Sequence, residues 1–367
     1  MITLIQFYKK PLLFEQPLSI ITTCDPLRLA DCFERIEEAL RRRCYCAGFV
    51  SYEAGYAFEK KLCQQKHHDF PLLCVGVYKS PRIGLPQWSS THYAHLGGLR
   101  LSLDRRVYDE HIQIIRRHIK AGDVYQITYC IKLFFDFYGS AYSLYQRLVR
   151  AQPVPYPAYI ETDFCKILSL SPELFLHSRG REIISKPMKG TWQRGRNPLS
   201  DTLQRFRFRC DAKNRAENVM ITDLLRNDFG RISARVRVPR LFEITPYKTL
   251  FQMTSTVRAR LALGYSVYRL FQSLFPSGSV TGAPKIRAME IIRQLEGRER
   301  KIYTGAIGYI TPDRDVFFNI PIRTLLLGKD TGEMGIGGGI VWDSTPDGEW
   351  DEGLLKARFV TDLFKSS

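Results

Sequence analysis

The chain has 367 residues, of which 44% are hydrophobic and 25% are charged, as is usual for a globular protein that buries a large core. No apolar run approaches the roughly 18 residues of a membrane span, and the charges of the first ten residues follow their apolar stretch, which is the wrong order for a signal peptide. We therefore expect a cytoplasmic protein with no membrane partner. The nine scattered cysteines have the spacing of neither a disulfide framework nor a zinc site.

The formal net charge is +17, from 54 basic and 37 acidic residues. The basic residues are dispersed, and no aromatic-and-basic signature of an RNA-binding sheet accompanies them. We therefore expect no nucleic-acid partner. A positive field would also attract a small dianionic substrate.

Residues 1–100 are predicted to form a strand-rich N-terminal part with one helix, near residues 26–42. Leu29, Phe33, Ile36 and Leu40 recur there at the period of a helix that buries one face. The stretch 81–98 is rich in Pro, Gly, Ser and His and is predicted to be a connecting loop. We predict an N-terminal subdomain of residues 1–100, packed closely on a core of residues 101–367.

The core is predicted to combine hairpin-type strands with separate helices, which is typical of an α+β fold. A helix at 107–121 is expected to end at Gly122, and a long helical stretch occupies 201–228. A further helix is predicted at 283–295, and a last helix begins near Gly348. The predicted strands are 125–137, 158–161, 165–171, 306–311, 315–327 and 333–342.

Lys189 stands where an extended apolar run is broken by Pro187 and Gly190. This placement can direct an amine into a cavity, where desolvation lowers its pKa and makes it a nucleophile near neutral pH. A lysine beside a glycine is more commonly a solvated loop residue. These few residues alone leave both interpretations open.

Two predicted helices carry side chains with oxygen ligands three residues apart. Glu349 and Glu352 share a face with Lys356, and Asn214 and Glu217 share a face of the earlier helix. Such side chains either lie on the surface or close around a hard cation such as magnesium. The glycine-rich stretch 335–340 could expose backbone N–H groups that hold an anion.

Long motifs in a fixed order extend these patterns over residues 105–365. They lie at 121–126, 171–173, 187–191, 216–228, 275–285, 303–308, 321–324 and 337–356. Through them the chain resembles the chorismate-utilising enzymes, and within that family the synthase subunits of aminodeoxychorismate synthases. The resemblance implies two facing antiparallel β-sheets with helices outside and an active site between the halves.

The resemblance also implies a role for each matching residue. Magnesium would be held by Glu217, Glu349 and Glu352, with Asn214 standing where relatives often have a fourth acidic residue. The remaining matches imply contacts with the substrate or its carboxylates, to which a guanidinium can bind in bidentate fashion. These residues are Gln126, Thr191, Tyr303, Arg323, Gly337 and Lys356.

The same resemblance implies covalent catalysis. Lys189 would attack C2 of chorismate and expel the C4 hydroxyl, which Glu173 would protonate as general acid. That role requires a carboxyl group whose pKa is raised. Ammonia would then enter at C4 and release the lysine, giving 4-amino-4-deoxychorismate, a precursor of 4-aminobenzoate and folate.

Two positions distinguish the subfamilies. Relatives that add water carry a lysine base where this chain has Gln126, which argues against isochorismate and salicylate synthases. Anthranilate synthases usually carry alanine where Lys189 stands, so an anthranilate synthase is the alternative enzyme. A non-catalytic binding protein with the same fold is the alternative from another class. Gln252 replaces a histidine common in anthranilate synthases, so no acid–base role is expected there.

No segment of the chain has the Cys, His and Glu arrangement of a glutaminase or resembles a pyridoxal-phosphate lyase. We therefore expect a separate glutamine amidotransferase subunit to supply ammonia and another enzyme to release 4-aminobenzoate. The N-terminal Leu-Leu-Glu-Ser type of signature linked to tryptophan binding is also not found. Feedback inhibition by tryptophan is therefore not expected.

Overall fold

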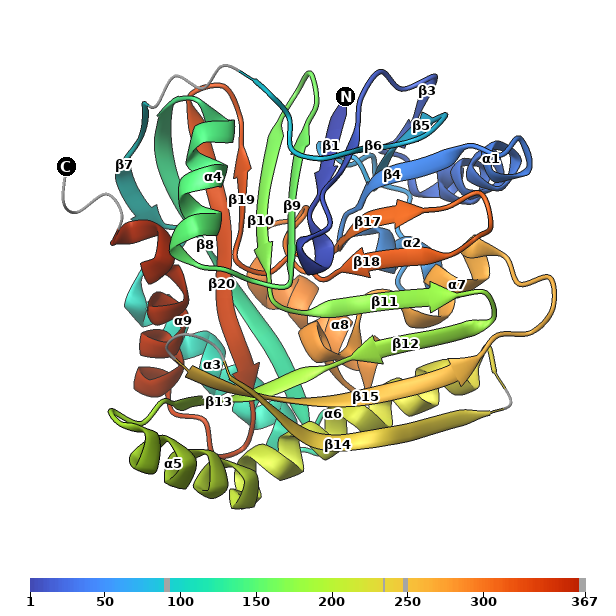
Figure 1. Cartoon of the computed structure of the whole chain (residues 1–367). Helices are drawn as coiled ribbons and strands as arrows, with labels where there is room; N and C mark the ends of the chain where they lie inside the picture. The colour runs from blue at the N-terminus through green and yellow to red at the C-terminus, as the bar shows by residue number, and fades with distance from the viewer. Residues whose placement is uncertain (89–92, 234, 247–249, 363–367) are drawn as a thin grey trace.

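The computed structural model describes residues 1–88, 93–233, 235–246 and 250–362. Its strands form two antiparallel sheets of ten strands each, here called sheet A and sheet B. In Figure 1, sheet A is on the left, where β8 and β20 are labelled, and sheet B extends to the right from β13 and β15 up to β4.

Sheet A is built around two long strands, β8 (Gln126–Gly139) and β20 (Thr331–Ile340), which pair from Asp136 opposite Thr331 to Ile127 opposite Ile340. On the far side of β8 lie β16 (Gly282–Ala283) and β7 (Ala94–Leu101). Beyond β20 the order is β19 (Thr324–Leu327), β10 (Lys166–Ser171), β9 (Tyr156–Glu161), β1 (Ile2–Ile5), β2 (Leu12–Phe14) and β6 (Arg82–Ile83).

Sheet B begins with β13 (Met188–Gln193), which pairs with β15 (Leu250–Arg260), the strand that also pairs with β14 (Val236–Pro246). The order then continues through β12 (Glu182–Lys186), β11 (Leu174–Arg179), β18 (Val316–Asn319), β17 (Ala306–Ile310), β4 (Tyr45–Val50), β5 (Leu73–Tyr78) and β3 (Ser19–Thr23).

The helices cover the outer faces of the two sheets. The apolar cluster outside sheet A includes residues of α3 (Arg105–Lys120), α4 (Ala141–Ala151), α8 (Lys285–Glu296) and α9 (Pro346–Thr361). The cluster outside sheet B includes residues of α1 (Leu29–Arg41), α2 (Ala54–Phe58), α6 (Ala212–Gly230) and α7 (Val267–Leu274). Helix α5 (Pro198–Cys210) packs beside α6, β13 and β14.

A third apolar cluster fills the space between the sheets, with side chains from both of them. Alternation along the strands explains the layers: Ile160 of β9 faces this inner cluster, whereas its neighbour Tyr159 faces the outer cluster of sheet A. Burial of one such side chain contributes about 1.5–3 kcal/mol. The predicted α+β fold with two facing sheets is confirmed.

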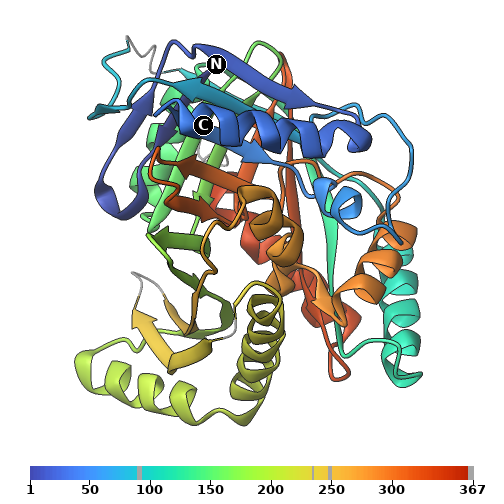
Figure 2. The same ribbon diagram turned by 90° about the vertical axis from the view of Figure 1, so that its right-hand side faces the viewer.

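Strands from residues 1–100 belong to both sheets, because β1 pairs with β9 in sheet A and β4 pairs with β17 in sheet B. Figure 2 shows α1 and the first strands along the upper side of the molecule, with α5 and α6 at the opposite end. The division into parts 1–100 and 101–367 stays a prediction. Within the described residues, no helix is long and apolar enough to cross a membrane.

Three predicted elements differ from those observed. The helical stretch 201–228 is two helices, because the side chain of Asp211 accepts a hydrogen bond from the N–H of Asn214 and caps α6. The strand 315–327 is divided into β18 and β19, and Arg323 between them has a left-handed backbone, φ +51°. The predicted loop 81–98 contains β6 and the start of β7, and its residues 89–92 lie outside the described residues.

Candidate active site

Lys189 lies where the edge of sheet B meets the end of the β8–β20 pair in sheet A. The pairing of β13 with β15 is irregular between Met188 and Thr191, and Gly190 has a left-handed φ of +86°, so the strand bends at the lysine. A Cβ atom added to Gly339 of β20 would lie 2.7 Å from Lys189 Nζ and 2.6 Å from Gln126 Nε2. The backbone of β20 therefore approaches this amine and this amide closely.

The surroundings lower the pKa of the half-buried Lys189 amine. Desolvation is the largest cause, and the positive charge of Lys356 acts in the same direction. The carboxylates of Glu217, Glu173 and Glu352 oppose the shift but do not cancel it. The amine is therefore more readily available in its neutral, nucleophilic form than that of a solvated lysine.

Glu173 lies between β10 and β11 and is only 3% exposed. Burial raises the pKa of its carboxyl group to about 7, although a hydrogen bond from Ser279 and the charge of Lys189 oppose the shift. Ser279 Oγ donates to Glu173 Oε1 at 2.7 Å. The group can therefore hold a proton near neutral pH.

Helix α9 presents Glu349, Glu352 and Lys356 to the backbone of β20. A Cβ atom on Gly338 would lie 3.0 Å from Glu349 Oε2, 3.7 Å from Glu352 Oε1 and 3.5 Å from Lys356 Nζ. The Lys356 ammonium also donates to Gly337 O at 2.7 Å and pairs with Glu352 at 2.7 Å. The absence of side chains on these glycines lets the helix bring its charges directly over the strand.

The two α9 carboxylates differ in their protonation equilibria. Burial and the charge of Glu352 raise the pKa of Glu349, although Ser344 Oγ donates to its Oε1 at 2.6 Å. Burial alone would raise the pKa of Glu352, but the charge and hydrogen bond of Lys356 hold it below its usual value. Like charges that crowd in this way favour a bound cation.

Helix α6 contributes Glu217 and Asn214 from the other side. Burial raises the pKa of the half-buried Glu217 carboxyl, and the nearby Lys189 opposes this. Asn214 Nδ2 donates to Asp211 Oδ1 at 2.7 Å. Its Oδ1 would lie 2.5 Å from a Cβ on Gly190, so the amide oxygen is adjacent to the bend that carries Lys189.

The chemistry of these side chains suits magnesium, because Glu217, Glu349, Glu352 and Asn214 all offer hard oxygen ligands. The oxygens of Glu349 and Glu352 converge over Gly338, and the charge of Glu352 raises the pKa of both Glu217 and Glu349. The described residues contain no group of three His, Cys, Asp or Glu side chains already close enough to hold a metal. The donor set fits the ion, and coordination would require the carboxylates to draw together.

Gln126 is fully buried, and neither its Oε1 nor its Nε2 has a hydrogen-bond partner. A buried amide without partners is costly unless a ligand bonds to it. Gln126 begins β8 and lies beside Lys189 across Gly339. Its position is that of a side chain that would meet a bound molecule.

The other predicted substrate-binding residues lie around this cluster at different depths. Gly337 has φ +155°, and a Cβ there would lie 2.1 Å from Tyr129 O. The ring of Tyr303 packs on Gly335 of β20, with Cγ 2.2 Å from the position of a Cβ atom on that glycine. Arg323 is half-buried beside β19, and Thr191 is exposed on β13, opposite Gln252.

Two serine donors were not predicted. Ser279 bonds to Glu173 and Ser344 bonds to Glu349. Ser279 lies within the 275–285 motif, which was the available signal, whereas Ser344 is in a short turn without any distinguishing pattern.

Comparison with known proteins places the chain in a family. The sequence profile of the chorismate binding enzymes matches residues 85–362. Aminodeoxychorismate synthase component 1 of Escherichia coli K12 is 32% identical over 98% of this chain and 86% of that protein. The Klebsiella aerogenes protein of the same name is 39% identical over 73% of this chain, which spans only 60% of that relative.

The fold has a close counterpart among solved structures. Anthranilate synthase component I of Streptococcus pneumoniae superposes with a TM-score of 0.83 at 22% identity, over 95% of this chain and 91% of that one. This likeness concerns the fold, and the profile match and the Escherichia coli relative carry the assignment. The chain belongs to the family of chorismate binding enzymes.

Proposed function

We propose that the chain is the synthase component of an aminodeoxychorismate synthase, which aminates chorismate at C4. The observation that carries this proposal is the amine of Lys189, with its lowered pKa, among three carboxylates and beside the unpartnered amide of Gln126. Relatives that bear the corresponding name are 32–39% identical to the chain. A lysine at this position is the feature that distinguishes C4 amination from anthranilate formation.

In the proposed reaction the neutral Lys189 amine forms a bond to C2 of chorismate. The ring double bonds shift, the C4–O bond breaks, and Glu173 gives its proton to the departing hydroxyl, which leaves as water. Ammonia then forms a bond to C4 and gives up one proton, which restores the acid form of Glu173. The double bonds shift back, and the C2–N bond to Lys189 breaks. Chorismate and ammonia are thereby converted to 4-amino-4-deoxychorismate and water, and the lysine is regenerated.

The remaining site residues would bind and orient the substrate. Lys356 and Arg323 offer cations for its two carboxylates, and Tyr303 and Gly337 would make the accompanying polar contacts. We propose that Glu217, Glu349 and Glu352, with Asn214 beside them, hold Mg²⁺. The ion, when bound, neutralises the charge of the ring carboxylate.

We also propose a glutamine amidotransferase as the partner that delivers ammonia, and a role in 4-aminobenzoate and folate synthesis. The component 1 names of the relatives support a second component. Glutamine-dependent activity should then require an added amidotransferase, whereas ammonium salts should support the reaction without one. Glutamine use by the chain alone would contradict the partner.

Product analysis tests the reaction itself. The protein would be incubated with chorismate, Mg²⁺ and ammonium, with and without an aminodeoxychorismate lyase. We expect 4-aminobenzoate only when the lyase is present. Fluorescent anthranilate formed without lyase would identify the alternative enzyme, and a chain that binds chorismate but releases no product would be the non-catalytic alternative. A covalent adduct on Lys189, detected by mass after rapid quenching, would support the lysine intermediate.

A further inference from the structure

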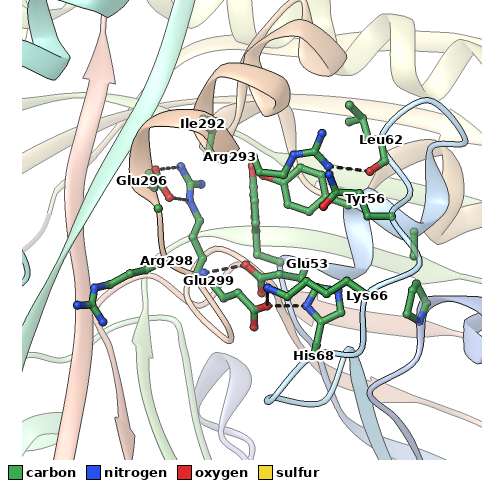
Figure 3. Close-up of a pocket in the computed structure, with 16 residues that line it drawn as sticks. Glu53, Tyr56, Leu62, Lys66, His68, Ile292, Arg293, Glu296, Arg298 and Glu299 are labelled. Atoms are coloured by element: carbon green, nitrogen blue, oxygen red, sulfur yellow. Dashed lines mark hydrogen bonds and ion pairs between the residues drawn. The ribbon is translucent and has the colours of Figure 1, made fainter.

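A recess of about 200 Å³ lies away from Lys189, between the turn after β4, the segment 62–68 and the end of α8. Figure 3 shows Glu53 at its centre, close to Glu299 and His68. None of the predicted site residues lines this recess. Glu53 is only 5% exposed, and the proposed chemistry makes no use of it.

Both carboxylate oxygens of Glu53 hold the same loop, residues 297–305, which joins α8 to β17 and is called here the Tyr303 loop. Glu53 Oε1 accepts from the N–H of Arg300 at 2.7 Å, and Oε2 accepts from the N–H of Lys301 at 2.9 Å. The N–H of Tyr52 donates to Lys301 O at 2.8 Å. Tyr52 and Glu53 therefore clamp the loop from the N-terminal part of the chain through three hydrogen bonds to its backbone.

The backbone of the Tyr303 loop needs such a clamp. Lys301 and Thr304 have φ of +57° and +60°, values that are costly for residues other than glycine. Conformations of this kind persist only where surrounding contacts impose them. Glu53 and Tyr52 supply these contacts for Lys301.

The loop in turn sets the position of a predicted substrate-binding residue. Tyr303 is 8% exposed, and its ring lies directly on Gly335 of β20. Two residues further along the strand, Gly337 O accepts from Lys356, and Gly338 lies beneath Glu349 and Glu352. A displacement of the loop would therefore move the Tyr303 ring relative to the strand that carries the site.

We propose that Glu53 is a positioning residue, which fixes the Tyr303 loop and through it places Tyr303 against β20 for substrate binding. The inference rests on the proposed function, in which Tyr303 contacts a carboxylate of chorismate. The substitution Glu53→Gln tests this role, because it replaces one acceptor oxygen with an NH₂ group. That group cannot accept the hydrogen bond from the backbone N–H that it would face.

The test is a double-mutant cycle of Glu53→Gln and Tyr303→Phe, with kcat and KM for chorismate measured in ammonium and Mg²⁺. We expect Glu53→Gln to raise KM about tenfold, with kcat changed less than about twofold, because the contact binds the substrate in ground and transition states alike. When Glu53→Gln is added to Tyr303→Phe, KM should rise by less than about twofold relative to the Tyr303→Phe variant. Additive effects, or an unchanged KM in either single variant, would overturn the inference.

Glu37→Gln is the matched control. Glu37 is 9% exposed, its Oε1 accepts from the N–H of Val267 at 2.7 Å, and its Oε2 pairs with Arg314 at 2.6 Å. This carboxylate also holds a backbone N–H from the N-terminal part, but at the start of α7. We expect a lower Tm with KM unchanged within about twofold. A rise in KM equal to that of Glu53→Gln would show a general loss of stability instead of positioning.

Two further measurements keep the outcome decisive. If Glu53→Gln does not fold, Glu53→Asp keeps the carboxyl group but has a shorter side chain, and we expect KM to rise about threefold. Hydrogen exchange of the Arg300 and Lys301 amides should quicken in the Glu53 variant and not in the Glu37 variant. A wild-type protein that made no aminodeoxychorismate would contradict the proposed function. Unchanged hydrogen exchange of the Arg300 and Lys301 amides in the Glu53 variant would instead refute the clamp alone.

Discussion

The two ends of the β8–β20 pair differ in how their buried polar groups are satisfied. Towards one end, Glu333 near the start of β20 bonds to both Lys132 and Lys301, at 2.6 and 2.9 Å. At the other end the amide of Gln126 has no partner, and the Lys189 amine lies beside it. The same strand pair therefore carries a completed ion-pair network and, elsewhere along it, a buried amide without a partner.

This difference distinguishes buried polar groups that stabilise the fold from those that are available to bind a ligand. Removal of one partner from a buried ion pair destabilises a fold, whereas a buried polar group without a partner carries a cost that a bound ligand can remove. The comparison predicts that changes at the Glu333 end lower stability and that changes at the Gln126 end lower activity. The predictions below test this contrast, from the largest expected effect to the smallest.

Replacement of Lys189 by alanine should have the largest effect. We expect aminodeoxychorismate formation in ammonium to fall at least about 1000-fold, because the proposed nucleophile is lost. The free energy of unfolding should not fall, since desolvation already disfavours the charged amine. A lyase-coupled assay and urea denaturation would measure both. Lys186→Ala on the adjacent strand β12 is the control and should keep activity, and an active Lys189→Ala variant would refute covalent catalysis.

Glu173→Gln should lower kcat by about 100-fold or more, because the amide cannot donate the proton required by the leaving hydroxyl. In the wild type the carboxyl pKa is about 7, so kcat should fall as pH rises through 7 and the acid form is lost. Initial rates between about pH 5.5 and pH 9 would show this limb. If kcat still fell as pH rose through 7 in the Glu173→Gln variant, the fall would reflect the titration of another group.

The same carboxyl group makes a pH-dependent contribution to stability. The native state retains its proton up to about pH 7, whereas the unfolded chain releases it near pH 4.5. Between these values the native state binds more protons, so the free energy of unfolding decreases as pH rises. Urea denaturation should therefore show Glu173→Gln gaining stability relative to wild type as pH rises from 4.5 to 7, and no relative gain would contradict the raised pKa.

Glu333→Gln tests the paired end. Lys132 and Lys301 would lose their common counter-charge in a site where the side chains of Lys132 and Glu333 are 10% and 15% exposed. We expect the free energy of unfolding to fall by about 3 kcal/mol. Glu161→Gln is the control, since its pair with Lys166 is long, 3.9 Å, and more than a third exposed, and should cost less than about 0.5 kcal/mol. Equal losses of unfolding free energy in the two variants would show that the buried pairs of Glu333 stabilise the protein no more than the exposed pair of Glu161.

Glu217→Gln should have the smallest effect of the series. We expect Mg²⁺ binding, measured by calorimetry without substrate, to weaken about tenfold because one anionic ligand is lost. Asp223→Asn on the same helix is the control, since Asp223 pairs with Arg226 on the exposed face. Identical affinities in the two variants would remove Glu217 from the proposed metal site.

The sequence predicted the positions of β8, α8 and α9 to within a few residues. The common face of Glu349, Glu352 and Lys356 also followed from helical spacing. The break at Asp211 did not, because one capping side chain overrides helix propensity on both sides of it. The sequence also did not predict the hydrogen bond from Ser279 to Glu173, which joins residues 106 apart, or the clamp of Glu53 on the Tyr303 loop. Such contacts depend on tertiary packing, which spacing alone does not reveal.

The pairing of β4 with β17 has a consequence for how the chain is made. Phe49 lies opposite Ile307, so the middle of sheet B joins a strand synthesised early to one synthesised late. Closure of so long a loop is slow and entropically costly. Until β17 emerges from the ribosome, β4 presents an unpaired edge that is prone to association with other chains. We therefore expect chaperone dependence during synthesis to be greatest before β17 has emerged.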